Sequence, residues 1–207
     1  MPAIGRDPDC SWWNLAGTDL ERAAKGLGGE PGIPAVVMTA EVLRRAGRPR
    51  QALQHLGLGR ARAKTTQETA LIDFAEATAW WALAEDDRAR PRYESVAEYV
   101  RSCGDQVAKT ACDLGILRCR RIHVDRDGLR DARGVLSAAQ VQGDPDLVAD
   151  ALRETAAWAL LRSRHGEALD LADRAADIHA ESGDRYLRSM AEVLIARSLN
   201  AHGEWES

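Results

Sequence analysis

Residues 141–184 read VQGDPDLVADALRETAAWALLRSRHGEALDLADRAADIHAESGD, and this stretch decides the fold. A Gly-Asp pair lies near each of its ends, at positions 143–144 and 183–184. Between these pairs, apolar residues recur at helical spacing on both sides of a turn at 163–166. Glycine can end one helix in the left-handed conformation, and aspartate can cap the next helix. The stretch therefore predicts two helices joined by a tight turn.

The same signals recur along the chain at a nearly fixed period. A third Gly-Asp pair lies at 104–105, so the three glycines are 39 and 40 residues apart. The tight turns within the pairs are followed by Ala52, Ala89, Ala132 and Ala168, which are 37, 43 and 36 residues apart. A period in this range is typical of stacked helical hairpins. Because alternating β-branched runs are also rare, we expect an all-α protein from position 34 onward.

The turn residues and the small and large residues that follow them form a recognisable pattern. It is carried by Gly47, Ala52, Tyr93, Leu136, Ser163, Ala168 and Gly203. The pattern resembles the tetratricopeptide repeat (TPR), although the period exceeds the roughly 34 residues usual for that repeat. It is similar to the looser helical arrays of bacterial signal-transduction regulators. The resemblance covers about residues 34–207 and implies a right-handed superhelix of stacked antiparallel helical hairpins, a TPR-like α-solenoid.

The chain is expected to divide into two parts, an arm at 1–33 and a repeat domain at 34–207. Proline and glycine punctuate the arm, in which we predict one short helix at about 18–27. The tryptophan pair at 12–13 is predicted to dock on the first hairpin, with a partner anchor as the alternative. The repeat domain has room for about four and a half hairpins. Its last segment, 184–201, predicts either a capping helix or the first half of a hairpin that is cut off.

Composition narrows the classes of function. The 207 residues carry 28 basic and 32 acidic side chains, and this slightly acidic balance argues against direct nucleic-acid binding. No apolar run approaches the roughly 18 residues of a membrane span, and the start of the chain has no secretory signal, so we expect a cytoplasmic protein. The four cysteines form no C-x-x-C pair and the five histidines lack zinc-site spacing. We therefore predict no metal and no cofactor.

The repeat register predicts which side chains face the concave side of the array. Adjacent helical residues point about 100° apart, so Trp80 would pack in the core while Trp81 faces the concave surface. Arginine beside tryptophan would suit an anionic ligand with a flat or apolar part. The alternative is that these arginines pair with acidic residues of the array and that Trp81 packs against the adjoining hairpin. The predicted concave residues are Glu41, Arg44, Phe74, Thr78, Trp81, Arg153, Arg197 and Asn200.

We expect a regulatory interaction module whose concave face binds a protein, a peptide or a small anionic effector. The resemblance to regulator arrays implies a partner domain, either attached or separate. One alternative is an enzyme or accessory protein of a biosynthetic pathway, but phosphate-loop and serine-hydrolase motifs are absent. Only Glu41, His123 and the arginines are candidates for a convergent acid–base set. Another alternative is a structural homodimer formed through the C-terminal hairpin.

Overall fold

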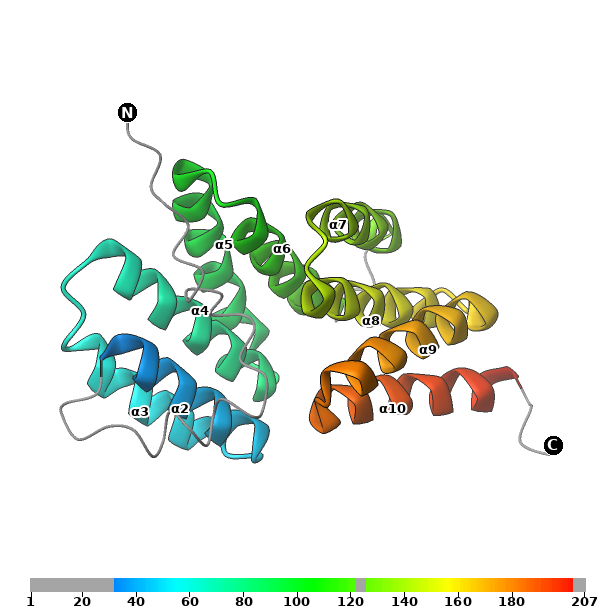
Figure 1. The fold of residues 1–207 in the computed structure, drawn as a ribbon, viewed down its shortest axis with the longest axis horizontal. Coiled ribbons are helices and arrows are strands. Elements are labelled where there is room, and N and C mark those ends of the chain that lie inside the picture. Colours follow the sequence, from blue (N-terminus) through cyan, green and yellow to red (C-terminus); the bar gives the residue numbers. More distant parts are fainter. Residues whose placement is uncertain (1–31, 122–125, 203–207) are drawn as a thin grey trace.

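A computed structural model describes residues 32–121 and 126–202, and it is all-helical over these residues (Figure 1). The all-α prediction is therefore confirmed. The predicted helix of the arm, the tryptophan pair at 12–13 and His123 lie outside the described residues. The nine described helices are α2 (Ile33–Arg45), α3 (Pro49–Arg60), α4 (Thr66–Ala82), α5 (Asp86–Cys103), α6 (Gln106–Arg120), α7 (Gly128–Gln142), α8 (Pro145–Leu161), α9 (His165–Ser182) and α10 (Arg185–His202).

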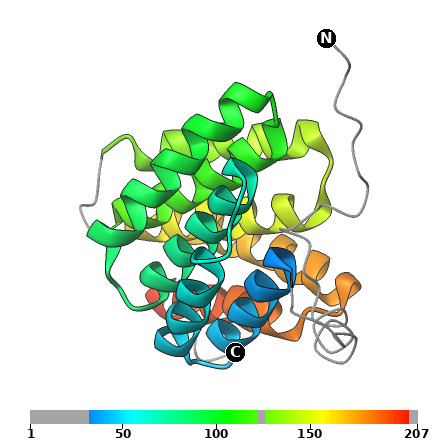
Figure 2. The same cartoon turned by 90° about the vertical axis from the view of Figure 1, so that its left-hand side faces the viewer.

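The helices stack as successive hairpins. Each helix packs against the next one in the chain, and α2, α4, α6, α8 and α10 also pack in sequence against one another. These five helices, called the first helices below, form one continuous wall, while α3, α5, α7 and α9, called the second helices, pack outside it. The array curves, so that α2 and α10 lie on the same side of the molecule (Figures 1 and 2). The right-handed sense of the superhelix stays a prediction.

The Gly-Asp pairs act as the sequence predicts. Gly104, Gly143 and Gly183 end α5, α7 and α9 in the left-handed conformation, with φ between 73° and 75°. The aspartate after each glycine accepts a hydrogen bond from the backbone N–H three residues later, at 2.9–3.0 Å. Each pair thus satisfies backbone groups at the end of one helix and the start of the next.

Small residues let the two helices of each hairpin approach closely. The four recurrent alanines, Ala52, Ala89, Ala132 and Ala168, are at most 1% exposed. A helix with a small residue at the crossing point can pack at short interaxial distance. Glycine has the same effect between hairpins, because a Cβ atom on Gly115 of α6 would lie 2.5 Å from a ring carbon of Tyr93 in α5. The alanine-rich composition is therefore explained by close helix packing.

The core is divided into layers between neighbouring hairpins. Ile33, Val36, Leu56 and Ile72 form one layer at the start of the array. A larger layer joins α6, α7, α8, α9 and α10 further along. Among the described residues, no helix combines the length and apolar character needed to cross a membrane.

Two tight turns place a residue other than glycine in the left-handed region. Ala84 has φ 58° and Ser163 has φ 56°, and they occupy the turn position equivalent to Gly47, which has φ 75°. This conformation costs an L-residue roughly 1–2 kcal/mol. Part of that cost is offset because glycine loses more backbone entropy on folding. We therefore expect Ala84→Gly and Ser163→Gly each to raise the free energy of unfolding by about 0.5–1 kcal/mol.

Urea denaturation measures this effect, and Gly47→Ala is the matched reverse substitution. We expect Gly47→Ala to lower the free energy of unfolding by about 1 kcal/mol. A loss of stability in Ala84→Gly would show that the turn is not strained.

Candidate functional site

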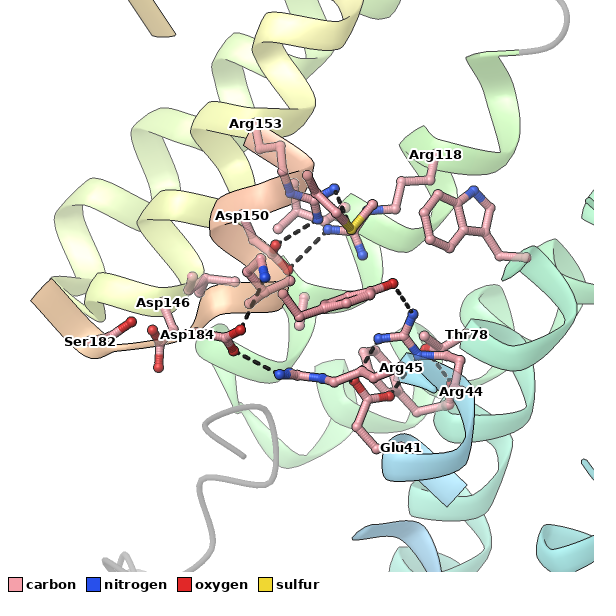
Figure 3. A pocket seen from close by; sticks show the side chains of 18 residues that line it. Glu41, Arg44, Arg45, Thr78, Arg118, Asp146, Asp150, Arg153, Ser182 and Asp184 are labelled. Atoms are coloured by element: carbon pink, nitrogen blue, oxygen red, sulfur yellow. Dashed lines mark hydrogen bonds and ion pairs between the residues drawn. The ribbon is translucent and has the colours of Figure 1, made fainter. Parts of the chain in front are cut away.

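A cavity of about 130 Å³ lies on the concave side, between the five first helices (Figure 3). It crosses the helices obliquely. Its walls come from the C-terminal parts of α2 and α4, the middle of α6, and the N-terminal turns of α8 and α10. Side chains from residues more than 140 positions apart in the sequence therefore share one cavity.

Six of the eight predicted concave residues line this cavity. They are Glu41, Arg44, Phe74, Thr78, Trp81 and Arg153. Arg197 and Asn200 do not line it; both are exposed, near the end of α10. On α10 the cavity wall ends at Met190, and a rise of 1.5 Å per residue places Arg197 about 10 Å farther along the helix. The ligand-binding role of these residues stays a prediction.

The two adjacent tryptophans of α4 point in different directions. Trp81 is half-buried in the cavity wall, with the guanidinium carbon of Arg118 5.5 Å from its ring centroid. Both tryptophans pack against the core cluster that contains Tyr93, but Trp80 does not line the cavity, and the guanidinium carbon of Arg88 in α5 lies 4.6 Å from its ring centroid. Tyr93 also orients the floor of the cavity, because its hydroxyl donates to Thr78 Oγ1 at 3.0 Å and its ring meets Phe74 edge-on. A second helix thus fixes side chains that line the concave face.

On α2, Glu41 is held by two arginines. Arg44 Nε donates to Glu41 Oε2 at 2.7 Å, and Arg45 Nε donates to Oε1 at 2.7 Å. Burial opposes ionisation of Glu41, but Arg44 and Arg45 outweigh it and lower the pKa of its carboxyl group. Because both oxygens are engaged and the pKa is low, Glu41 is poorly suited to act as a general base.

On the opposite wall, Asp150 joins two arginines from neighbouring first helices. Arg118 Nη2 donates to it at 3.0 Å and Arg153 Nη2 donates at 2.7 Å. Burial again opposes ionisation, but the two guanidinium groups hold the pKa of Asp150 well below its usual range. Arg44 and Arg153 are therefore both paired with carboxylates of the array. This pairing matches the alternative in which the concave arginines bind acidic residues of the chain itself.

Long side chains connect the two ends of the array across the cavity. Arg45 Nη1 lies 2.7 Å from Asp184 Oδ2, and Arg44 Nη1 donates to the Tyr186 hydroxyl at 3.4 Å (Figure 3). Both guanidinium groups also lie within 5.7 Å of the Tyr186 ring centroid. These contacts join α2 to α10 and close one side of the cavity.

Several residues that line the cavity are not predicted from the sequence. They are Arg45, Arg118, Asp146, Asp150, Asp184 and Tyr186. Asp184 is identifiable from the sequence as a helix cap, but nothing local indicates its second bond to Arg45, which lies 139 positions away. Within the described residues, no group of three His, Cys, Asp or Glu side chains is arranged to hold a metal ion.

His179, near the C-terminal end of α9, is fully buried behind the cavity. Neither ring nitrogen has a hydrogen-bond partner among the described residues. Burial lowers the pKa of His179; nearby Asp150 and Asp184 oppose this effect, and Arg153 and Arg45 add to it. The neutral imidazole is therefore the form that the folded chain accommodates.

This burial predicts a pH dependence of stability. The folded state binds fewer protons than the unfolded state once the pH falls below about 6.5, the ordinary pKa of histidine. We expect the free energy of unfolding to be highest above that pH and to fall by up to about 1.4 kcal/mol per pH unit toward pH 5. Urea titrations at several pH values would measure the slope, and His179→Leu should flatten it. An equal slope in His179→Leu would assign the effect to other groups.

Comparisons with known proteins bear on the fold. No protein-family model and no curated protein sequence matches the chain. The structure is similar to that of a putative kinesin light chain from Podosopora anserina with nearly identical TPR-like repeats, at 14% identity and a TM-score of 0.56. A single-substitution variant of that protein gives 14% identity and a TM-score of 0.57. Both comparisons cover 84% of this chain and 88% of the other chain. The predicted TPR-like architecture is therefore confirmed.

Proposed function

We propose that this TPR-like array binds a segment of another protein across its concave face and takes one side chain of that segment into the cavity. Repeats of this fold commonly serve as protein-interaction modules. The observation that carries the proposal is the cavity itself, which all five first helices build and which opens on the concave face. The regulatory role and cytoplasmic location predicted from the sequence belong to the same proposal.

The size of the cavity favours a side chain over a whole effector molecule. Small-molecule sites usually enclose roughly 300–1,000 Å³, whereas this cavity encloses about 130 Å³. Its apolar wall consists mainly of Phe74, Trp81, Leu114, Leu187 and Met190. Such a pocket resembles the anchor sites that supply most of the affinity at interfaces between proteins.

The charges of the cavity are already paired in a way that disfavours a small anionic effector. Arg44, Arg45, Arg118 and Arg153 each contact a carboxylate of the array at 3.0 Å or less. An anion would therefore have to displace a carboxylate that belongs to the chain. A homodimer formed through α10 would need exposed apolar surface on that helix. In α10, Ala191 and Leu194 are buried and Val193 is exposed, so little such surface is available.

Selection of peptides from a random display library against the full chain tests the proposal. We expect selected peptides to bind at least tenfold more weakly to Trp81→Ala and to Leu187→Ala, since each substitution removes part of the anchor pocket. Val141→Ala is the control, because Val141 is 86% exposed on α7, away from the cavity. Unfolding curves of each variant verify that the fold is retained.

Two results would contradict the proposal. One is a selection that yields no binding peptide. The other is a set of peptides whose affinity is unchanged in both cavity variants. Light scattering on the same samples reports dimerisation, and a dimer disrupted by Val193→Asp would favour the homodimer alternative instead.

A further inference from the structure

We infer that the side chain taken up by the cavity is cationic, a lysine or arginine of the partner, with the Asp146 carboxylate as its acceptor. This inference rests on the proposed function and gives the chemical class of the anchor. The concave arginines predict an anionic ligand, whereas this inference assigns a cationic one.

Asp146 differs from the other acidic residues of the cavity. Glu41, Asp150 and Asp184 each bind at least one arginine at 3.0 Å or less. Asp146 lies in the first turn of α8, is half-buried and lines the cavity. Among the described residues, its side chain makes no hydrogen bond and no ion pair. It is therefore the cavity carboxylate left for an external cation.

The surroundings of Asp146 offer acceptors to a cation. Asp146, Ser182 and Asp184 lie at the same end of the cavity (Figure 3). The Ser182 hydroxyl donates its proton to the His179 carbonyl at 3.2 Å, so its lone pairs stay available. An ammonium or guanidinium group carries donors only, which matches this end of the cavity. The apolar wall beyond it, including Leu187 and Met190, suits the aliphatic stem of lysine or arginine.

The electrostatics of this end of the cavity point the same way. Burial raises the pKa of Asp146, and the neighbouring carboxylates of Asp144, Asp150 and Asp184 raise it further, while Arg45 opposes them. The surroundings of Asp146 within the chain thus disfavour its ionised form. A bound cation would stabilise that form, and an unpaired charge held at a cost in stability is typical of a binding site.

Titration of the full chain with n-butylammonium, an analogue of the lysine side chain, tests this inference. Butyrate is the matched anionic probe, and backbone amide shifts in the NMR spectrum report binding. We expect saturable shifts at the N-terminus of α8 with n-butylammonium and none with butyrate. Asp146→Asn should weaken n-butylammonium binding at least tenfold, because it removes the charged acceptor. It should also keep or raise the melting temperature, since Asp146 makes no internal bond that would be lost.

Asp177→Asn is the control, because it removes the same charge from an exposed position on α9, away from the cavity. Butyrate binding, equal binding in Asp146→Asn, equal weakening in Asp177→Asn, or no binding of n-butylammonium would each overturn the inference. Peptide selection distinguishes failure of the cationic-anchor inference from failure of the proposed peptide binding. Peptides that depend on Trp81 but carry no basic anchor would retain the proposed function and reject the cationic class.

Discussion

Trp158→Ala is expected to lower the free energy of unfolding by about 3–5 kcal/mol. Trp158 is fully buried in α8 and packs in a core layer with Leu117, Leu129 and Ala168. Removing its indole ring would leave a cavity shared by α6, α7, α8 and α9, which the surrounding helices can fill only in part. Because small domains are stable by about 5–15 kcal/mol, this loss is a large share of the total.

A second substitution makes this prediction more specific. A Cβ atom on Gly128, at the start of α7, would lie well inside van der Waals contact with the Trp158 ring. Gly128→Ala should therefore destabilise the natural chain by about 1–3 kcal/mol. In the Trp158→Ala background the clash is absent and alanine is the better helix former, so the same change should be neutral or stabilising.

Urea denaturation of the four proteins in this double-mutant cycle gives the coupling energy between the two positions. We expect a coupling energy of at least about 1 kcal/mol, such that Gly128→Ala is less destabilising in the Trp158→Ala background than in the natural chain. Additive effects would mean that α7 does not approach Trp158 as closely as the structure indicates. Gly134→Ala is the matched control on α7, because a Cβ atom there would meet open space.

The parts of the fold that could be predicted depend on local chemistry. Gly143 and Asp144 identify a helix end and a helix start because left-handed backbone and side-chain capping are decided within a few residues. Ala168 identifies a close crossing because its period repeats along the chain. Trp81 could be placed on the concave side because helical periodicity gives the direction of a side chain around its axis.

The parts that could not be predicted depend on geometry between hairpins. Helical periodicity predicts which side of α10 carries Arg197. It does not predict how far along the helix Arg197 lies from the cavity, because the cavity crosses the helices obliquely. The pairing of Arg45 with Asp184 depends on the curvature of the whole array, which sums small rotations between hairpins. The isolation of Asp146 is equally invisible in the sequence, because it follows from which carboxylates the arginines reach.

The network around Asp150 gives the second large effect. Asp150→Asn removes the carboxylate that Arg118 and Arg153 share, and leaves two largely buried guanidinium groups with fewer partners. We expect the free energy of unfolding at pH 7 to fall by about 2–3 kcal/mol, below the usual cost of breaking a fully buried pair because Asp150 is partly exposed. Urea denaturation at pH 7 measures the change.

The pH dependence of the same variant provides a check on the cause. Because the pKa of Asp150 is lowered on folding, its contribution is present above the ordinary carboxyl pKa of about 4 and is lost as the pH falls toward the folded value. The natural chain and Asp150→Asn should therefore differ most at neutral pH and converge in acid. A difference that stays constant with pH would assign the loss of stability to altered packing instead of charge.

Asp150→Asn should also change what the cavity binds. With the shared carboxylate gone, Arg118 and Arg153 can form a two-armed site for an external carboxylate. We therefore expect the variant to gain saturable binding of butyrate, the anionic probe that the natural chain should not bind. Asp150→Leu tests whether an amide is needed or the freed arginines suffice, and Asp177→Asn again controls for net charge. If neither Asp150 variant binds butyrate, then the arginines find other carboxylates in the array, and pairing within the chain alone explains their place on the concave wall.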